Sequence, residues 1–181
     1  MKNMALLIVD VQKAMIDDHP FHEEELLKNI ERLLKTARQN RIEVIYIRHD
    51  GGMGDELESC TEGWEIYPSI APKLTEKIFD KRFNSAFKET QLKEYLSEKN
   101  IGTIVLVGMQ TEYCIDATCK VAFEYGFTVL IPEGTTATYD NDFFSGAVTA
   151  KYYEQKIWDK RFADVLSMEE IIQKMAPLDD E

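Results

Sequence analysis

Cys114 is the residue of this chain whose position best suits covalent chemistry. It ends the segment Gly108–Cys114 (GMQTEYC), whose composition is typical of a turn between a strand and a helix. A thiol at a helix N-terminus feels the positive end of the helix dipole, which favours the nucleophilic thiolate. The same turn offers unpaired backbone N–H groups that can hold an oxyanion. The alternative is a structural cysteine, because a buried free cysteine packs as a small hydrophobe.

Two charged residues elsewhere in the chain are partners for such chemistry. Asp10 closes the otherwise apolar run Ala5–Val9, where an unpaired carboxylate is costly and needs either a partner or a raised pKa. It either takes part in the chemistry or caps a nearby loop. Lys81 lies in the segment Phe79–Phe87 (FDKRFNSAF). A lysine there is by itself typical of a solvated surface charge, and Arg82 is a rival cation one residue away.

The elements that would position these residues alternate along the chain. Continuous apolar or β-branched runs predict strands, and a period of 3.6 predicts helices. The predicted strands are Ala5–Val9, Glu43–Ile47, Lys77–Phe79, Thr103–Val107, Thr128–Ile131 and Ala163–Leu166. The predicted helices are Glu23–Asn40, Glu89–Glu98, Cys114–Tyr125, Asn141–Trp158 and Met168–Met175, the last capped by Ser167.

This alternation predicts a three-layer, Rossmann-like α/β fold: a mainly parallel sheet with helices on both faces. Ligands bind such sheets at the carboxyl ends of the strands. Each of the residues Asp10, His49, Asp50, Lys81 and Cys114 follows a predicted strand, so we expect them to converge on one crevice.

Bulk properties restrict the class of protein. The 181 residues suit one domain over 1–181, with an acidic tail over about 177–181. A formal net charge of -12 argues against nucleic acid and anionic membrane surfaces as partners. No apolar run is long enough to cross a bilayer. The three sparse cysteines, without a signal peptide, predict free thiols in the cytoplasm.

Three segments together resemble the isochorismatase-like cysteine hydrolases, a superfamily that includes nicotinamidase, N-carbamoylsarcosine amidase and isochorismatase. Leu7–Gln12 (LIVDVQ) is similar to the Asp-x-Gln opening of that superfamily, and Lys81 followed by Asn84–Phe87 (NSAF) is similar to its lysine segment. Val107–Ile115 (VGMQTEYCI) closely resembles its nucleophile turn. Gly63–Ile66 (GWEI) and Pro72 also match a common pattern, so the resemblance covers nearly the whole chain.

The resemblance implies a catalytic triad of Asp10, Lys81 and Cys114. It also implies a cis peptide between Met109 and Gln110 that directs N–H groups of this turn, with that of Cys114, toward an oxyanion. In these roles Asp10 takes the thiol proton and delivers it to a leaving amine, Lys81 stabilises the thiolate, and Cys114 forms a thioester that water hydrolyses.

Five residues are expected at the binding site of a small-molecule substrate: Gln12, Met15, Trp64, Phe87 and Tyr113. Gln12 would orient Asp10 or the water, and the others would form pocket walls, where the superfamily often has Phe in place of Met15. Each aromatic residue has ordinary core packing as its alternative. The segment 139–144 is expected to be either a lid-like loop or a helix-capping turn.

No metal or other cofactor is expected. The nicotinamidase branch binds a metal through an Asp-x-His element, but here the comparable region runs Arg48–Gly52 (RHDGG), in which that order is absent. His19 and His22 flank Pro20 and lack further ligands, so they are expected in a surface loop.

These observations favour a hydrolase that cleaves the C–N bond of a small amide or carbamoyl compound. The alternatives are an isochorismatase-type vinyl-ether hydrolase, a metal-assisted nicotinamidase, and a non-catalytic binding module on the same fold. Retention of Cys114 favours C–N hydrolysis, because the vinyl-ether reaction does not need the cysteine. The resemblance further implies a homodimer or homotetramer.

Overall fold

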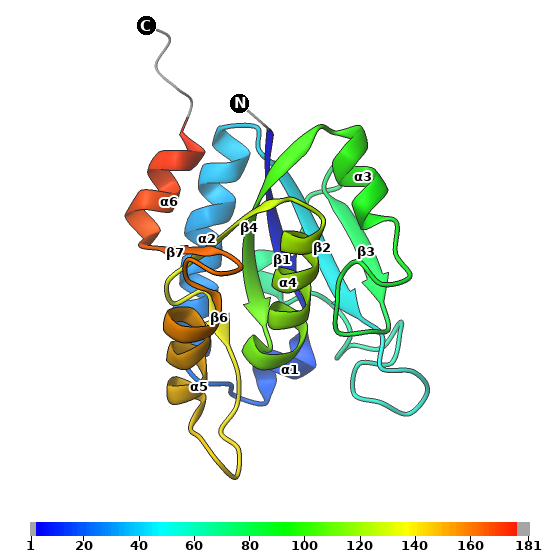
Figure 1. The fold of residues 1–181 in the computed structure, drawn as a ribbon. Helices are drawn as coiled ribbons and strands as arrows, with labels where there is room; N and C mark the ends of the chain where they lie inside the picture. Colours follow the sequence, from blue (N-terminus) through cyan, green and yellow to red (C-terminus); the bar gives the residue numbers. More distant parts are fainter. Residues whose placement is uncertain (1–2, 177–181) are drawn as a thin grey trace, which may run out of the picture.

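The structure, a computed structural model, describes residues 3–176 and consists of one sheet with helices on both faces (Figure 1). The expected acidic tail at 177–181 lies outside the described residues. The strands are β1 (Asn3–Val9), β2 (Glu43–His49), β3 (Lys77–Lys81), β4 (Ile101–Met109), β5 (Thr128–Pro132), β6 (Thr136–Ala137) and β7 (Asp164–Leu166). The helices are α1 (Lys13–Asp17), α2 (Glu23–Gln39), α3 (Leu92–Glu98), α4 (Asp116–Glu124), α5 (Gly146–Tyr152) and α6 (Met168–Met175). Short helical turns are η1 (Pro68–Ile70), η2 (Thr111–Ile115) and η3 (Tyr153–Trp158).

The strand order is β3-β2-β1-β4-β5-β7, and β6 pairs with the end of β4. Each of these strand pairs is parallel. The predicted three-layer α/β fold with a mainly parallel sheet is therefore confirmed. Because all the strands run the same way, their carboxyl ends meet at one edge, which is the lower edge in Figure 1.

The sheet separates two hydrophobic cores, and alternate residues of each central strand face opposite cores. On β1, Leu6 and Ile8 pack toward α2 and α6, whereas Leu7 and Val9 pack toward α3 and α4. Since both faces are covered, the central strands β1 and β4 are apolar over most of their length, as parallel strands usually are.

The last helix shows how local sequence sets an element boundary. Ser167 accepts a hydrogen bond from the backbone N–H of Glu170, and the Glu170 carboxylate accepts one from the backbone N–H of Ser167. This reciprocal capping box begins α6 where the sequence predicts it.

Two predicted helices begin later than expected. The chain does not turn helical at Asn141, because the side chain of Asn141 accepts hydrogen bonds from the N–H groups of Phe143 and Phe144 and forms a turn. Helix α5 starts at Gly146, with Ser145 as its N-cap. Helix α3 likewise starts at Leu92, not Glu89.

Three short elements at the carboxyl edge were missing from the sequence prediction. Helix α1 and strand β6 have only five and two residues, too few to show a period. The third is the wide helical turn η2 (Thr111–Ile115), which contains Cys114, so α4 begins at Asp116 and the predicted helix start at Cys114 is wrong. Across residues 3–176, no helix has the length and apolar character needed to span a bilayer.

Gly108 allows β4 to lie close to β1 at this edge. Its φ is +127°, and a Cβ at this position would lie 2.0 Å from the backbone oxygen of Val9. A side chain therefore cannot be added without moving one of the two central strands.

We predict that Gly108→Ala lowers the free energy of unfolding by about 3 kcal/mol or more, since it combines an unfavourable φ with a backbone clash. Gly126→Ala is the matched control, because Gly126 also has positive φ (+83°) but open space around it. That control should lose only about 1 kcal/mol. Urea unfolding of both variants measures the difference, and equal losses would contradict the steric explanation.

Candidate active site

A buried ion pair lies at the carboxyl edge of the sheet. The ammonium of Lys81, at the end of β3, is 2.6 Å from Oδ2 of Asp10, which follows β1. The side chains of Lys81 and Asp10 are 0% and 3% exposed. Asp10 has a left-handed backbone (φ 54°), a conformation that aspartate tolerates better than most residues.

This burial decides between the two neighbouring cations. Lys81 is enclosed, so it is not the solvated surface charge that its sequence context alone suggests. Arg82, by contrast, has a side chain that is 74% exposed and pairs with Asp50 at 2.8 Å. Residue 81 is the last residue of β3 and is turned inward, and residue 82 is turned outward. Lys81 is thus the cation of the site.

Cys114 lies against the same ammonium. The distance from Lys81 Nζ to Cys114 Sγ is 3.3 Å, and a third neighbour, His49 Nδ1, is 3.0 Å away. The structure therefore brings Asp10, Lys81 and Cys114 together, as the sequence analysis expects. It adds His49, whose position after β2 was the signal that pointed to it.

The turn that carries Cys114 is held by β6 from one side. Gly108 donates to the carbonyl of Thr135, Thr111 donates to the hydroxyl of Thr136, and Thr138 donates to the Glu112 carboxylate. The peptide bond between Met109 and Gln110 is cis. The N–H groups of Tyr113 and Ile115 both donate to the carbonyl of Gln110, which closes the turn around that peptide.

Gln12 connects three loops of the site with a single amide. Its oxygen accepts from the backbone N–H of His49 at 2.7 Å, and its nitrogen donates to the carbonyls of His49 and Trp64 at 3.0 and 2.9 Å. Because Gln12 is fully buried and its amide is occupied by backbone groups, it positions the site's loops.

The other residues expected at the pocket occupy different environments. Met15 lies in the core beneath α2, and Phe87 packs in the opposite core against Tyr125 and Phe127. Trp64 is 7% exposed and stacks under the guanidinium of Arg48 at 3.5 Å. Tyr113 is 54% exposed, which leaves its ring available beside Cys114.

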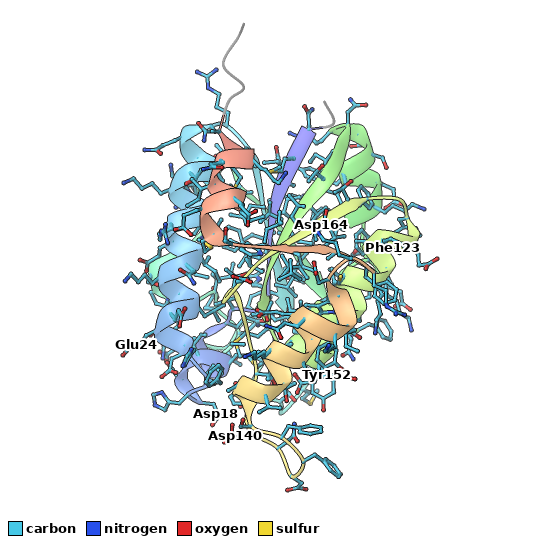
Figure 2. The ribbon with its side chains drawn as sticks, turned by 60° about the vertical axis from the view of Figure 1, so that its left-hand side comes forward. Asp18, Glu24, Phe123, Asp140, Tyr152 and Asp164 are labelled. Carbon is cyan, nitrogen blue, oxygen red and sulfur yellow. The ribbon has the colours of Figure 1, made fainter. Side chains whose placement is uncertain are left out.

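A groove lies next to the turn that carries Cys114. It has a volume of about 630 Å³ and is bordered by Glu112, Tyr113, the loop 141–144, and α5 with the start of η3. The loop projects beyond the sheet, with Asp140 at its base and Tyr152 on the helix above it (Figure 2). Asp140 accepts from the N–H of Gly146, so the segment 139–144 both caps α5 and carries the exposed Phe143 and Phe144.

The environment of Cys114 favours the neutral thiol at rest. Burial raises the pKa of Cys114 to about 12, and the negative charge of Asp10 acts in the same direction, while Lys81 opposes both. From the helix dipole we expect a lowered pKa for Cys114. That expectation is wrong, because burial of the thiol is the largest effect and raises the pKa. The second carboxylate oxygen of Asp10, Oδ1, is buried and has no hydrogen-bond partner among residues 3–176, so it is free to accept a proton.

The site also contains donor atoms of the kinds that bind metals. Asp10, His49 and Cys114 each offer one, and these atoms lie within 4.8 Å of one another. All three are already in contact with the Lys81 ammonium. A side-chain cation therefore occupies the place between them.

The parallel-sheet α/β fold thus brings a cysteine, a lysine and an aspartate together at the strand ends. The chain belongs to the isochorismatase family, because the model of the isochorismatase domain matches residues 4–170. It is accordingly a hydrolase of this family, and the family expected from the sequence is confirmed.

Individual relatives agree with this assignment. The uncharacterised isochorismatase family protein YrdC of Bacillus subtilis (strain 168) is 32% identical, over 93% of this chain and 94% of its own. Streptothricin hydrolase of Streptomyces noursei is 30% identical over 75% of this chain, which spans 55% of that relative. N-carbamoylsarcosine amidase of Arthrobacter sp. is 26% identical, over 96% of this chain and 72% of its own. A crystal structure of an isochorismatase family protein superposes with a TM-score of 0.86 at 30% identity, covering 92% of this chain and 99% of that one.

We predict that Asp10→Asn makes Cys114 react faster with iodoacetamide at pH 7–9, because the nearby negative charge that raises the pKa of Cys114 is removed. In the parent, the rate should rise about tenfold per pH unit in this range. Both are measured in a Cys60→Ser background, since Cys60 is exposed and would react as well.

Asp50→Asn is the matched control for this measurement. It removes a carboxylate that pairs with Arg82 and does not contribute to the raised pKa of Cys114. Its alkylation profile should match that of the parent. An unchanged profile in Asp10→Asn would show that Asp10 does not control the thiol.

We also predict that prolonged chelation leaves the melting temperature and the Cys114 alkylation rate unchanged, because Lys81 fills the space between the three donor atoms. A loss that added Zn²⁺ restores would contradict this expectation. Lys81→Met, which frees the donors, is the positive control for metal binding by the same groups.

Proposed function

We propose that this hydrolase cleaves the C–N bond of a small amide or carbamoyl compound through a covalent thioester on Cys114. The observation that carries the proposal is the contact of one buried ammonium with both a carboxylate and a thiol: Lys81 Nζ is 2.6 Å from Asp10 and 3.3 Å from Cys114.

In the first half-reaction, Cys114 Sγ attacks the substrate carbonyl carbon as its proton passes to Asp10. The raised pKa of Cys114 supports this order of events, because the thiol keeps its proton until a base removes it during attack. The free oxygen of Asp10, Oδ1, is suited to receive the proton. Lys81 remains charged and stabilises the sulfur as it becomes anionic.

The tetrahedral intermediate then loses the amine. Its oxyanion is stabilised by the backbone N–H groups of Gln110 and Cys114, and Asp10 delivers its proton to the departing nitrogen. The C–N bond breaks and a thioester remains on Cys114.

In the second half-reaction, Asp10 takes a proton from water, and the resulting hydroxide attacks the thioester. The C–S bond breaks, a carboxylic or carbamic acid is released, and Cys114 recovers the proton held by Asp10. Atoms balance as one amide and one water giving one acid and one amine.

Two kinds of support favour an amide over other hydrolysable bonds. N-carbamoylsarcosine amidase is named for an amidase activity, and its similarity covers 96% of this chain and 72% of that relative. The proton stored on Asp10 during acylation also suits an amine, which is a poor leaving group until it is protonated.

The test is ammonia release from a panel of small primary amides and carbamoyl compounds in the presence of chelator. Cys114→Ala should lower kcat by about 10³-fold or more. Cys119→Ala is the matched control, because Cys119 is buried in the core one turn along α4 and should affect stability only. Activity that persists in Cys114→Ala would rule out the thioester route and favour vinyl-ether hydrolysis.

A further inference from the structure

A third acceptor completes the surroundings of Lys81. A buried ammonium has three N–H donors, and each needs a partner because leaving one unpaired in the interior is costly. The three neighbours within hydrogen-bond distance of Lys81 Nζ in the described residues are Asp10 at 2.6 Å, His49 at 3.0 Å and Cys114 at 3.3 Å. Two of these belong to the proposed reaction, and His49 has no part in it so far.

We propose that His49 is a positioning residue: its Nδ1 accepts a hydrogen bond from Lys81 and thereby holds the ammonium against Cys114. The inference rests on the proposed function for its meaning in turnover, but the contact itself is independent of the substrate.

The fold places His49 and Lys81 side by side. They are the last residues of the neighbouring strands β2 and β3, and the parallel register pairs them directly. Asp10 follows β1 on the other side, and its backbone N–H donates to the carbonyl of Ile47 on β2. Three adjacent strand ends thus deliver a carboxylate, an imidazole and an ammonium to one point.

The backbone of His49, at the carboxyl end of β2, is held by two hydrogen bonds to one side chain. The Gln12 side chain accepts from its N–H at 2.7 Å and donates to its carbonyl at 3.0 Å. A buried glutamine that uses both ends of its amide on one residue restricts where that residue's side chain can point. The role of Gln12 in the structure is therefore to fix the backbone of His49, rather than to orient a water molecule as the sequence suggested.

The protonation state of His49 agrees with an acceptor role. Burial lowers the pKa of His49 and the charge of Lys81 lowers it further, while the carboxylates of Asp10, Asp55 and Asp50 oppose them. The imidazole is therefore neutral at neutral pH. Nδ1 accepts from Lys81 when the proton is on Nε2.

Two substitutions separate this role from simple packing. His49→Asn keeps an acceptor oxygen close to the position of Nδ1, and His49→Leu keeps bulk but removes the acceptor. With the acceptor gone, Lys81 should be held less firmly near the sulfur, so Cys114 should become about tenfold less reactive toward iodoacetamide at a given pH. His49→Asn should remain within about twofold of the parent.

Turnover gives a second readout on the same variants. With an amide substrate from the panel, His49→Leu should lower kcat about tenfold and leave KM within about twofold, because Lys81 acts on the reacting sulfur rather than on substrate binding. His49→Asn should restore kcat. A parent-like His49→Leu, or a folded His49→Asn as impaired as His49→Leu, would overturn the proposal.

Nitrogen NMR of the parent protein decides the contact without any variant that must fold. The expected result is a neutral His49 ring with its proton on Nε2 and an unprotonated Nδ1. A proton on Nδ1 would overturn the proposal, since that nitrogen could not then accept from an ammonium. If no amide of the panel is hydrolysed, that result counts against the proposed function alone, because the alkylation and NMR measurements report on His49 without a substrate.

Discussion

The ion pair between Lys81 and Asp10 is the interaction on which the site depends. Its two side chains are almost completely buried, at 0% and 3% exposure, and their charged atoms are 2.6 Å apart. Removing one member of such a pair leaves an uncompensated charge in the interior, which costs several kcal/mol. Burial is the main reason that the pKa of the neighbouring Cys114 thiol is raised, and the pair adds two opposing effects: the carboxylate disfavours thiolate and the ammonium favours it. A thiol kept protonated by its surroundings reacts slowly with electrophiles in solution.

The surrounding fold holds these charges in place with backbone groups rather than with further charges. Parallel strands β1, β2 and β3 end at one edge, so residues distant in sequence meet there. Gln12 links the loop after β2 to the segment around Trp64, and β6 supports the turn that carries Cys114. Neutral hydrogen bonds of this kind fix geometry without altering the balance of charge around the sulfur.

Two neighbouring residues at the carboxyl end of β2, His49 and Asp50, contact different cations. The region after β2 has His49 and Asp50 in place of an Asp-x-His element. Asp50 pairs with the exposed Arg82, while His49 contacts the buried Lys81. The imidazole of His49 therefore faces a buried side-chain cation, and the Asp50 carboxylate faces an exposed one.

The sequence by itself determined the parallel α/β architecture and placed Asp10 and Cys114 after predicted strands, because apolar runs and residue types are local properties. It also located the Ser167 cap, whose hydrogen bonds span only three residues. Only the tertiary structure decided what depends on neighbours distant in the chain. It selected Lys81 over Arg82, turned Met15 and Phe87 into the cores, occupied the Gln12 amide with backbone groups, and reversed the expected direction of the Cys114 pKa. Burial and the distance between charges determine each of these outcomes, and both arise from packing across the sheet rather than from spacing along the chain.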